Sequence, residues 1–390
     1  MALSENLFEA FPPTSKAAWL AKIEKDLKGK PLADLQWQLE ENIELPPLYH
    51  PDDEPFDHAP LQGQRASNDW EIGEYLGVED FAQANAQALE GLAGGAEALL
   101  FRLQRHLDQP EQLAQLLRGI DPAIASIHFE ERYTALEPWA IFRQFADLIE
   151  QRGIAGQKVR GSIDFDPILD WSNPPIDKLA ELMRHCLERL PNFRVLQINA
   201  QRFHSGPDDS SMELAYALAK GSEYLARLTA AGLPAAAVNA QAQFAVSISK
   251  SYFVEIAKLR ALRLLWANVL KAYGVEDGQG PFIVAHFAEE SQDENANTNM
   301  IRASTQAMSA AIGGADLIYV LPANHALDEA STAFTRRIAR NVQHVLKMES
   351  RLHQVLDPGA GSYYIEKLTD KLAAQAWAKF QELEASGAFA

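Results

Sequence analysis

Two histidines stand where the chain leaves short apolar runs, and their imidazoles are the side chains best suited to chemistry. His204 ends the sequence Asn-Ala-Gln-Arg-Phe-His behind the run 195–198, and His286 directly follows the run 282–285. An imidazole can exchange a proton near neutral pH or donate a hydrogen bond to a carbonyl oxygen. For His204 the alternative is a histidine at a strand end that only packs or contacts solvent.

The residues that follow His286 are acidic. The sequence continues as Phe-Ala-Glu-Glu-Ser, which places Ala288, Glu289 and Glu290 close behind the imidazole. Two carboxylates repel an anionic substrate, and they do so more strongly in a cavity of low dielectric constant. This segment therefore opposes the binding of an anion beside His286.

Neither a metal site nor a nucleotide-binding loop is predicted. The 10 histidines show no ligand spacing such as His-Glu-x-x-His. The sequence Gly359-Ala-Gly361 follows a predicted strand, but it lacks the third glycine of a dinucleotide-binding fingerprint. A tight turn explains these two glycines more simply.

From residue 95 onward, short apolar runs alternate with long amphipathic segments, the pattern of strand-helix units around a parallel sheet. The predicted strands are 98–103, 126–129, 159–164, 195–198, 243–248, 282–285, 317–321 and 354–356. The predicted helices that follow them are 111–117, 138–151, 175–190, 211–231, 252–272, 297–312, 331–350 and 368–385. Eight repeats favour a closed (β/α)8 TIM barrel of class α/β, with the ligand site at the carboxyl ends of the strands. Two smaller α/β domains are the alternative.

The first 60 residues differ from the rest and predict an extended arm. Residues 19–27 have apolar side chains at helical spacing, and residues 35–45 alternate as a strand does. Five prolines among acidic and polar residues then disfavour regular structure between residues 46 and 60. We expect residues 1–60 to be an arm that needs another surface to pack on, and residues 61–390 to form the barrel.

Composition restricts the partners and the compartment. A net charge of −18 opposes binding to nucleic acid and to anionic membrane surfaces. The apolar runs are all shorter than the ~18 residues that a membrane span requires, and the first residues lack a secretory signal. The single cysteine, Cys186, cannot form an internal disulfide and is predicted to be a small buried residue on a helix. These features predict a cytoplasmic compartment.

Several segments resemble the barrel of methylmalonyl-CoA mutases. They are Phe-Pro-Pro-Thr-Ser at 11–15, Gly-Ser-Ile-Asp-Phe-Asp-Pro at 161–167, Glu-Ile-Ala-Lys-Leu-Arg at 255–260 and Asp-Pro-Gly-Ala-Gly-Ser-Tyr-Tyr at 357–364. The resemblance implies a (β/α)8 barrel that binds an acyl-CoA. Catalytic members isomerise methylmalonyl-CoA and succinyl-CoA through radicals that adenosylcobalamin supplies, while the barrel orients the substrate.

The same resemblance implies roles for single residues. His204 matches the histidine that hydrogen-bonds the thioester carbonyl, and Phe203 stands where catalytic chains commonly carry tyrosine. Trp70 remains from a segment whose aromatic side chains shape the substrate cavity, although the tyrosine and the Arg-Pro pair of that segment are missing; a plain packing aromatic is the alternative. His286 remains from a segment that binds substrate. Asn299 and Arg302 are further candidate substrate-binding residues, and packing or a hydrogen bond at the helix start is their alternative.

The departures from the family pattern point to its small, non-catalytic subunit. The interval from His204 to Glu213 is shorter than in catalytic chains, and the Asp-x-His-x-x-Gly motif of the cobalamin-binding domain does not occur. We therefore predict a catalytically degenerate barrel without a cobalamin-binding domain. Its partner would be a large catalytic subunit that holds the acyl-CoA and adenosylcobalamin. The alternatives are a catalytic acyl-CoA mutase barrel that works with a separate cobalamin-binding chain, and a scaffold without a small-molecule role.

Overall fold

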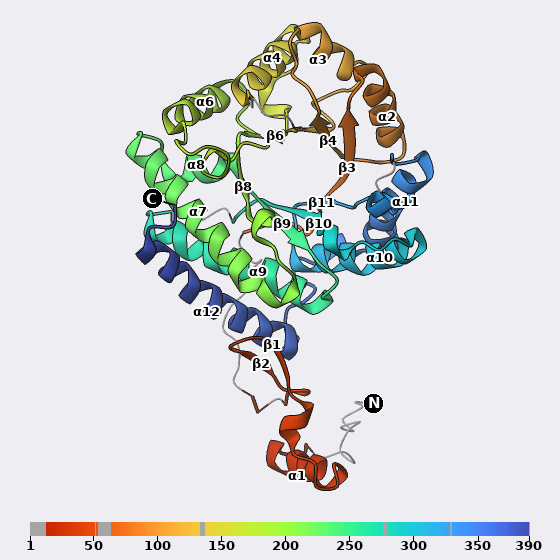
Figure 1. Ribbon diagram of the computed structural model, residues 1–390, viewed down its shortest axis with the longest axis vertical. Coiled ribbons are helices and arrows are strands. Elements are labelled where there is room, and N and C mark those ends of the chain that lie inside the picture. Colours follow the sequence, from red (N-terminus) through yellow and green to blue (C-terminus); the bar gives the residue numbers. More distant parts are fainter. Residues whose placement is uncertain are drawn as a thin grey trace, which may run out of the picture.

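The strands of the main sheet are parallel, and the sheet closes into a barrel. The computed structural model describes residues 13–50, 52–53, 64–132, 137–275, 280–327 and 330–389 (Figure 1). Its 9-stranded sheet has the order β7-β6-β5-β4-β3-β11-β10-β9-β8. The two strands at the ends of this order, β7 (Phe193–Arg194) and β8 (Leu196–Asn199), are separated along the chain by Val195 alone. They occupy one position of the ring, so the predicted (β/α)8 barrel is confirmed.

Helices surround the strands in chain order (Figure 1). The other barrel strands are β3 (Glu71–Val78), β4 (Ala98–Leu103), β5 (Ser126–Glu131), β6 (Gly161–Ile163), β9 (Ala242–Ile248), β10 (Ile283–Phe287) and β11 (Leu317–Tyr319). The helices are α2 (Phe81–Ala93), α3 (Pro110–Leu116), α4 (Pro138–Gln151), α5 (Pro167–Asp170), α6 (Ile176–Arg189), α7 (Ser210–Ala230), α8 (Ala235–Gln241), α9 (Tyr252–Ala272), α10 (Ala296–Gly313), α11 (Ala333–His344) and α12 (Tyr363–Ser386). Helix α12 lies outside the ring and packs on α7 and α9.

The first and the last barrel strands differ from the prediction. The ring begins with β3 and its helix α2, which were not predicted, and β3 pairs with β4 and β11. The predicted strand 354–356 is wrong, because a 3-10 turn at Leu352–Gln354 precedes a loop there and the ring is already closed. Glycine and glutamate are depleted in strands, and β3 contains two of each, which explains why its propensity is weak.

The other predicted segments overlap observed strands and helices because burial enforces them, whereas β7, α5 and α8 were not predicted. All seven residues of β9 are buried, as expected for a parallel strand covered on both faces. Helix α4 has proline at its first turn and buries Ile141, Phe142 and Phe145 on one face. Each such side chain contributes roughly 1.5–3 kcal/mol when fully buried. The predicted helix 331–350 ends earlier as an α-helix and continues as a π-helical turn, Val345–Glu349.

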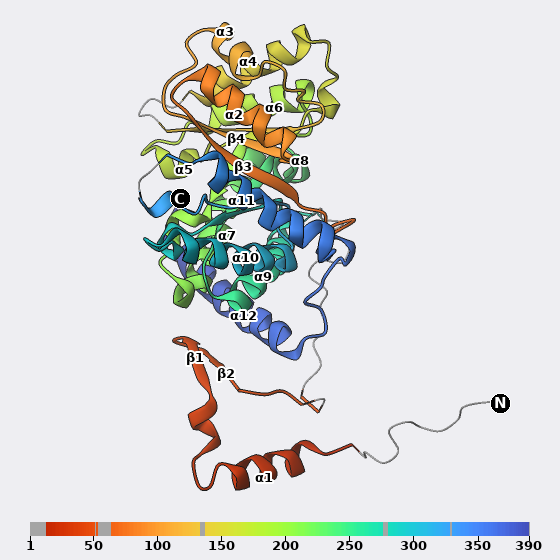
Figure 2. The same cartoon turned by 90° about the vertical axis from the view of Figure 1, so that its right-hand side faces the viewer.

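The N-terminal part lies beside the barrel and not within it. Helix α1 (Lys16–Asp26) and a hairpin of β1 (Trp37–Glu40) and β2 (Ile43–Leu45) extend away from the barrel strands (Figure 2). The Glu40 carboxylate accepts a hydrogen bond from the backbone of Ser211 at 3.0 Å, which anchors the hairpin to α7. Helix α1 buries no residue. The predicted boundary at residue 60 lies outside the described residues and stays a prediction.

Among the described helices, none is both long enough and apolar enough to cross a membrane. Cys186 is fully buried on α6, as predicted, and its thiol donates weak hydrogen bonds to the carbonyl groups of Leu190 and Phe193. Burial raises the pKa of this thiol well above its usual range.

Candidate functional site

A cavity of about 310 Å³ lies at the mouth of the barrel, meaning the end where the strands have their carboxyl ends. Side chains from several strands and the loops after them line this mouth cavity. They include Tyr75 of β3, Arg102 of β4, Glu130 of β5, Asp164 after β6, His204 after β8, Ser247 of β9, and His286 with Glu289 and Glu290 from β10 and its loop. The two predicted histidines therefore lie at the same cavity.

His204 is held between two carboxylates. It follows the 3-10 turn Ala200–Phe203, and its side chain is only 2% exposed. Its Nδ1 lies 3.1 Å from Glu213 Oε2, and its Nε2 lies 2.7 Å from Glu290 Oε1. Burial opposes the charged imidazolium, but the hydrogen bond to Glu213 and the charges of both carboxylates outweigh it and raise the pKa of His204. The imidazole is therefore a hydrogen-bond donor at both nitrogens when it is charged.

The Glu213 carboxylate is itself held by Lys258 and by the backbone of Ser247. Lys258 Nζ of α9 lies 2.8 Å from Glu213 Oε2, and the backbone N–H of Ser247 donates to Glu213 Oε1 at 2.8 Å. Burial raises the pKa of Glu213, but the Lys258 charge and the His204 hydrogen bond outweigh it, so that the pKa lies below its usual value. A charged, rigid carboxylate orients the His204 ring.

His286 differs from His204 because it lies deeper and carries no charge. Its Nδ1 is 2.8 Å from the Tyr75 hydroxyl, and its ring stacks on Tyr319 with the centroids 5.2 Å apart. Burial, together with the nearby Arg102, lowers the pKa of His286 to about 3. It is therefore neutral at physiological pH and bonds Tyr75 as a neutral ring.

Below the mouth, side chains fill the barrel axis. His128 Nδ1 lies 2.8 Å from the Ser162 hydroxyl, which also accepts a hydrogen bond from Gln243 Nε2 at 3.0 Å. Tyr319 lies across β3, where a Cβ on Gly73 would stand 2.5 Å from its ring. The free space left among these groups is about 10 Å³. A space of this size holds about one water molecule and nothing larger, so the axis is closed to an acyl chain.

Comparison with known proteins connects this barrel to a family. A family profile described as methylmalonyl-CoA mutase matches residues 105–390. A methylmalonyl-CoA mutase small subunit of Porphyromonas gingivalis is 34% identical over 99% of this chain and 65% of its own length. The chain belongs to the methylmalonyl-CoA mutase family.

Two further members of the methylmalonyl-CoA mutase family show how much of such a protein the chain spans. A small subunit of Streptomyces virginiae is 30% identical over 97% of this chain and 65% of its own length. A methylmalonyl-CoA mutase of Rhizobium meliloti is 28% identical over 95% of this chain and 58% of its own length. The chain thus spans less than two thirds of these relatives. A solved dihydropteroate synthase of Burkholderia cenocepacia aligns with a TM-score of only 0.40 at 13% identity, over 73% of this chain and 93% of its own.

In this member of the mutase family, Trp70 and Phe203 do not line the mouth cavity. Trp70 is 1% exposed, donates its indole N–H to Gln343 Oε1 at 3.3 Å, and borders a cavity at the opposite end of the barrel. Phe203 stacks on Tyr216 of α7 with the centroids 4.2 Å apart and contacts Phe389 near the end of the chain. Both rings serve packing.

Asn299 and Arg302 of α10 support the loop that carries the acidic pair. Asn299 Nδ2 donates to the carbonyl groups of Asp293 and Ala323 at 2.7 and 2.9 Å, and Asn299 Oδ1 accepts from the Asp293 backbone at 2.7 Å. Arg302 donates to the Ser291 carbonyl at 2.9 Å. These bonds match the packing alternative for both residues, which position the loop and do not line the mouth cavity.

Residues that sequence reasoning did not single out complete the mouth. Arg102 and Arg132 both bind the Glu130 carboxylate at 2.7 Å, and Asp164 accepts from Asn199 Nδ2 at 2.7 Å. Side chains on one face of a strand recur every second residue. The polar residues Ser126, His128 and Glu130 alternate in this way along β5, and this pattern is the sequence signal that could have indicated Glu130.

Proposed function

We propose that the chain is the barrel of a methylmalonyl-CoA mutase small subunit that has lost its own catalytic function. In this proposal it pairs with a large subunit that holds the acyl-CoA and adenosylcobalamin. The relatives from Porphyromonas gingivalis and Streptomyces virginiae carry the name of the small subunit. A large subunit from Streptomyces virginiae is a separate relative, 28% identical over 97% of this chain, which supports a partnership of two related chains.

The observation that carries the proposal is the filled barrel axis. A barrel that binds an acyl-CoA for this isomerisation needs a tunnel for the acyl-CoA arm. Here the hydrogen-bonded rings of Tyr75 and His286 and the stacked ring of Tyr319 occupy that path, and about 10 Å³ remains free. Close-packed side chains of this kind do not part for a ligand without loss of packing and hydrogen bonds.

The mouth gives independent support. In the family, the histidine at the position of His204 donates to the thioester carbonyl, but here its Nε2 already binds Glu290 at 2.7 Å. A thioester would have to replace a charged partner with a neutral one, which is unfavourable because charge-assisted hydrogen bonds are the stronger kind. The Glu289 and Glu290 carboxylates also repel an anionic acyl-CoA, as the sequence predicts.

The mouth histidines of this chain are poorly placed to ligate the cobalt of adenosylcobalamin. Both nitrogens of His204 are engaged by carboxylates, and His286 is 6% exposed below the mouth. We therefore assign the binding of adenosylcobalamin to the partner. We also place the pair in the cytoplasm, which the single buried thiol supports.

Turnover in the assembled pair tests the proposal. The chain is purified alone, with a free cobalamin-binding protein, and with a large subunit, and isomerisation is measured with adenosylcobalamin and methylmalonyl-CoA. We expect turnover only with the large subunit. Turnover by this chain with the free cobalamin-binding protein would establish the catalytic alternative instead.

A substitution of His204 then shows whether this residue takes part in catalysis or only in the structure of the chain. In the assembled pair, His204→Gln keeps a hydrogen-bond donor toward Glu213 and should leave kcat within about two-fold, whereas loss of a catalytic acid or hydrogen-bond donor typically costs about 100-fold or more. Calorimetric titration of the chain alone with acyl-CoAs provides the matching binding experiment. Saturable binding at micromolar concentration would contradict degeneracy.

A further inference from the structure

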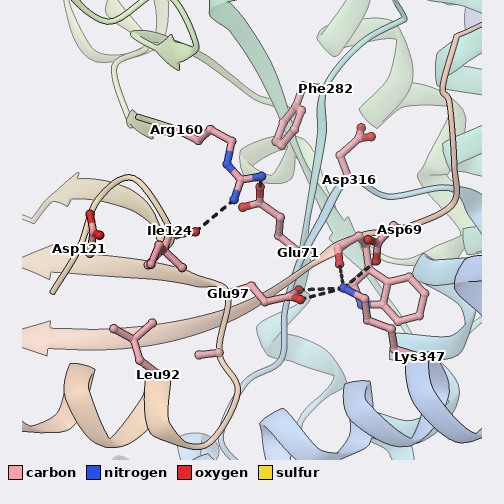
Figure 3. A pocket seen from close by; sticks show the side chains of 13 residues that line it. Asp69, Glu71, Leu92, Glu97, Asp121, Ile124, Arg160, Phe282, Asp316 and Lys347 are labelled. Atoms are coloured by element: carbon pink, nitrogen blue, oxygen red, sulfur yellow. Dashed lines mark hydrogen bonds and ion pairs between the residues drawn. The ribbon is translucent and has the colours of Figure 1, made fainter. Parts of the chain in front are cut away.

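A polar cavity of about 280 Å³ lies at the base of the barrel, where the strands begin. We call it the base cavity; its polar lining residues are Glu71, Ser126, His128, Arg160, Asn192 and Arg194. It adjoins a larger cavity of about 560 Å³, which is shown in Figure 3 and shares Glu71, Arg160 and Phe282 with it. The proposed function uses neither cavity.

Arg194 brings an uncompensated charge to the base cavity. Its guanidinium Cζ lies 3.7 Å from the centroid of the Phe282 ring, and its Nε is buried without a hydrogen-bond partner. Among the described residues, no carboxylate lies within ion-pair distance of this guanidinium; Asp316 and Glu71 attract it only from farther away. A guanidinium stacked on a ring still has its in-plane N–H groups free to donate.

His128 adds a second group without a partner. It is 3% exposed, its Nδ1 is bonded to Ser162, and its Nε2 has no hydrogen-bond partner among the described residues. Burial lowers the pKa of His128 to about 3, so the ring is neutral. A buried polar group left unpaired is unfavourable, and a ligand in the base cavity supplies the missing partner.

Arg160 makes the local charge positive. Its Nη1 lies 3.2 Å from Glu71 Oε1, and its Nη2 donates to the Ile124 carbonyl at 3.3 Å; both contacts are visible in Figure 3. The side chain is 50% exposed and can turn toward a ligand. Two guanidinium groups therefore face one carboxylate, Glu71, in the base cavity.

We propose that the base cavity binds one phosphoryl group, which accepts hydrogen bonds from Arg194 and Arg160 and contacts His128 and Ser126. Arginine forks match the oxygens of a phosphate better than any other side chain. The neighbouring larger cavity carries four carboxylates, Asp69, Glu97, Asp121 and Asp316. Lys347 pairs with the first two, and Arg65 and Arg263 pair with Asp316, so the carboxylates still outnumber their cationic partners and oppose further negative charge. The ligand is therefore free phosphate or a small phosphate ester whose remainder is uncharged, and not a polyanion.

Titration of the chain alone tests the site without reference to any mutase partner. Inorganic phosphate and phenyl phosphate are titrated in chloride buffer, with binding followed by calorimetry and by the 31P resonance. We expect saturable binding to the natural chain. Equal affinity for both probes indicates a site for the free anion, and tighter binding of phenyl phosphate indicates an ester whose ring enters the larger cavity.

Variants assign that binding to the base cavity. Arg194→Gln should weaken the binding of both probes about ten-fold or more, whereas Arg118→Gln, which removes the same charge from an exposed position, should not change it. Circular dichroism and thermal unfolding show whether Arg194→Gln folds, and Arg160→Gln at the half-exposed position replaces it if it does not. Absence of saturable binding below about 10 mM, or equal binding by the Arg194 or Arg160 variant, overturns the proposal.

Discussion

At the scale of single residues, the carboxyl group of Asp164 shows how the barrel mouth changes acidity. It lies after β6, accepts a hydrogen bond from Asn199 Nδ2 at 2.7 Å, and lines the mouth cavity. Burial, reinforced by the negative charge of Glu130, raises its pKa to about 7. Between about pH 4 and pH 7 the folded chain therefore holds a proton that the unfolded chain has released. Its contribution to the free energy of unfolding falls as the pH rises through this window.

Replacement of Asp164 by asparagine tests this assignment. Asp164→Asn keeps the Oδ1 acceptor for Asn199 but removes the ionisation. The free energy of unfolding of the variant, relative to that of the natural chain, should therefore rise by about 2 kcal/mol when the pH is raised from 5 to 8. Urea unfolding at both pH values measures the difference. Asp208→Asn, at an exposed position, is the control for net charge. An Asp164 variant with the same pH dependence as the natural chain would show that the carboxyl titrates normally.

At the scale of elements, β3 shows how a weak strand sequence can be required by its neighbours. Its glycines have different tasks: Gly73 pairs with Tyr319 of β11, whereas nothing lies within 4 Å of a Cβ placed on Gly77. Glycine at position 73 leaves room for the Tyr319 ring to cross the barrel axis. The filled barrel thus accounts for Gly73, one of the residues that lower the strand propensity of β3.

The two glycines form a matched pair for a stability experiment. Gly73→Ala forces a contact of 2.5 Å with the Tyr319 ring and should lower the free energy of unfolding by about 1–3 kcal/mol. Gly77→Ala on the same strand should have little effect. Combination of Gly73→Ala with Tyr319→Leu should cost less than the sum of the two single changes, because the clash with the ring is removed and only the contact of 2.9 Å with the Ile318 carbonyl oxygen stays. Additive effects in this double-mutant cycle would disprove the direct conflict.

At the scale of the whole molecule, the barrel is a filled scaffold with an arm beside it. The hairpin of the arm is attached to the barrel by Glu40 and Ser211, and Lys371 of α12 donates to the Glu44 carbonyl. Helix α1 buries no residue of its own. An amphipathic segment that stays unburied in one chain suits an arm that packs on a second chain, which is the role we propose for it.

Removal of residues 1–30 tests the arm. Because this deletion keeps the hairpin and takes away only segments that bury no described residue, the thermal midpoint of the barrel should stay within about 2 °C. Association with a large subunit should weaken about ten-fold or more. Sedimentation or light scattering of the mixed chains measures the association. Unchanged affinity would assign the partner contact to the barrel surface instead.

The sequence by itself determined the barrel, the family and the shared location of His204 and His286. The strand-helix alternation depends on neighbouring residues, and parallel strands place their carboxyl ends at one mouth. The segments 255–260 and 357–364 needed no tertiary information to indicate the family.

Only the tertiary structure decided what those histidines contact. Glu290 reaches His204 across 86 positions of the chain and Lys258 reaches Glu213 across 45, and no local pattern encodes such pairs. Likewise, β3 is a strand because β4 and β11 leave a place for it. Arg194 comes near His128 because both pair in register with Ser162 of the strand between them. Closure brings distant segments into contact, and these contacts decide which polar groups are paired, which are charged and how much of the axis stays open.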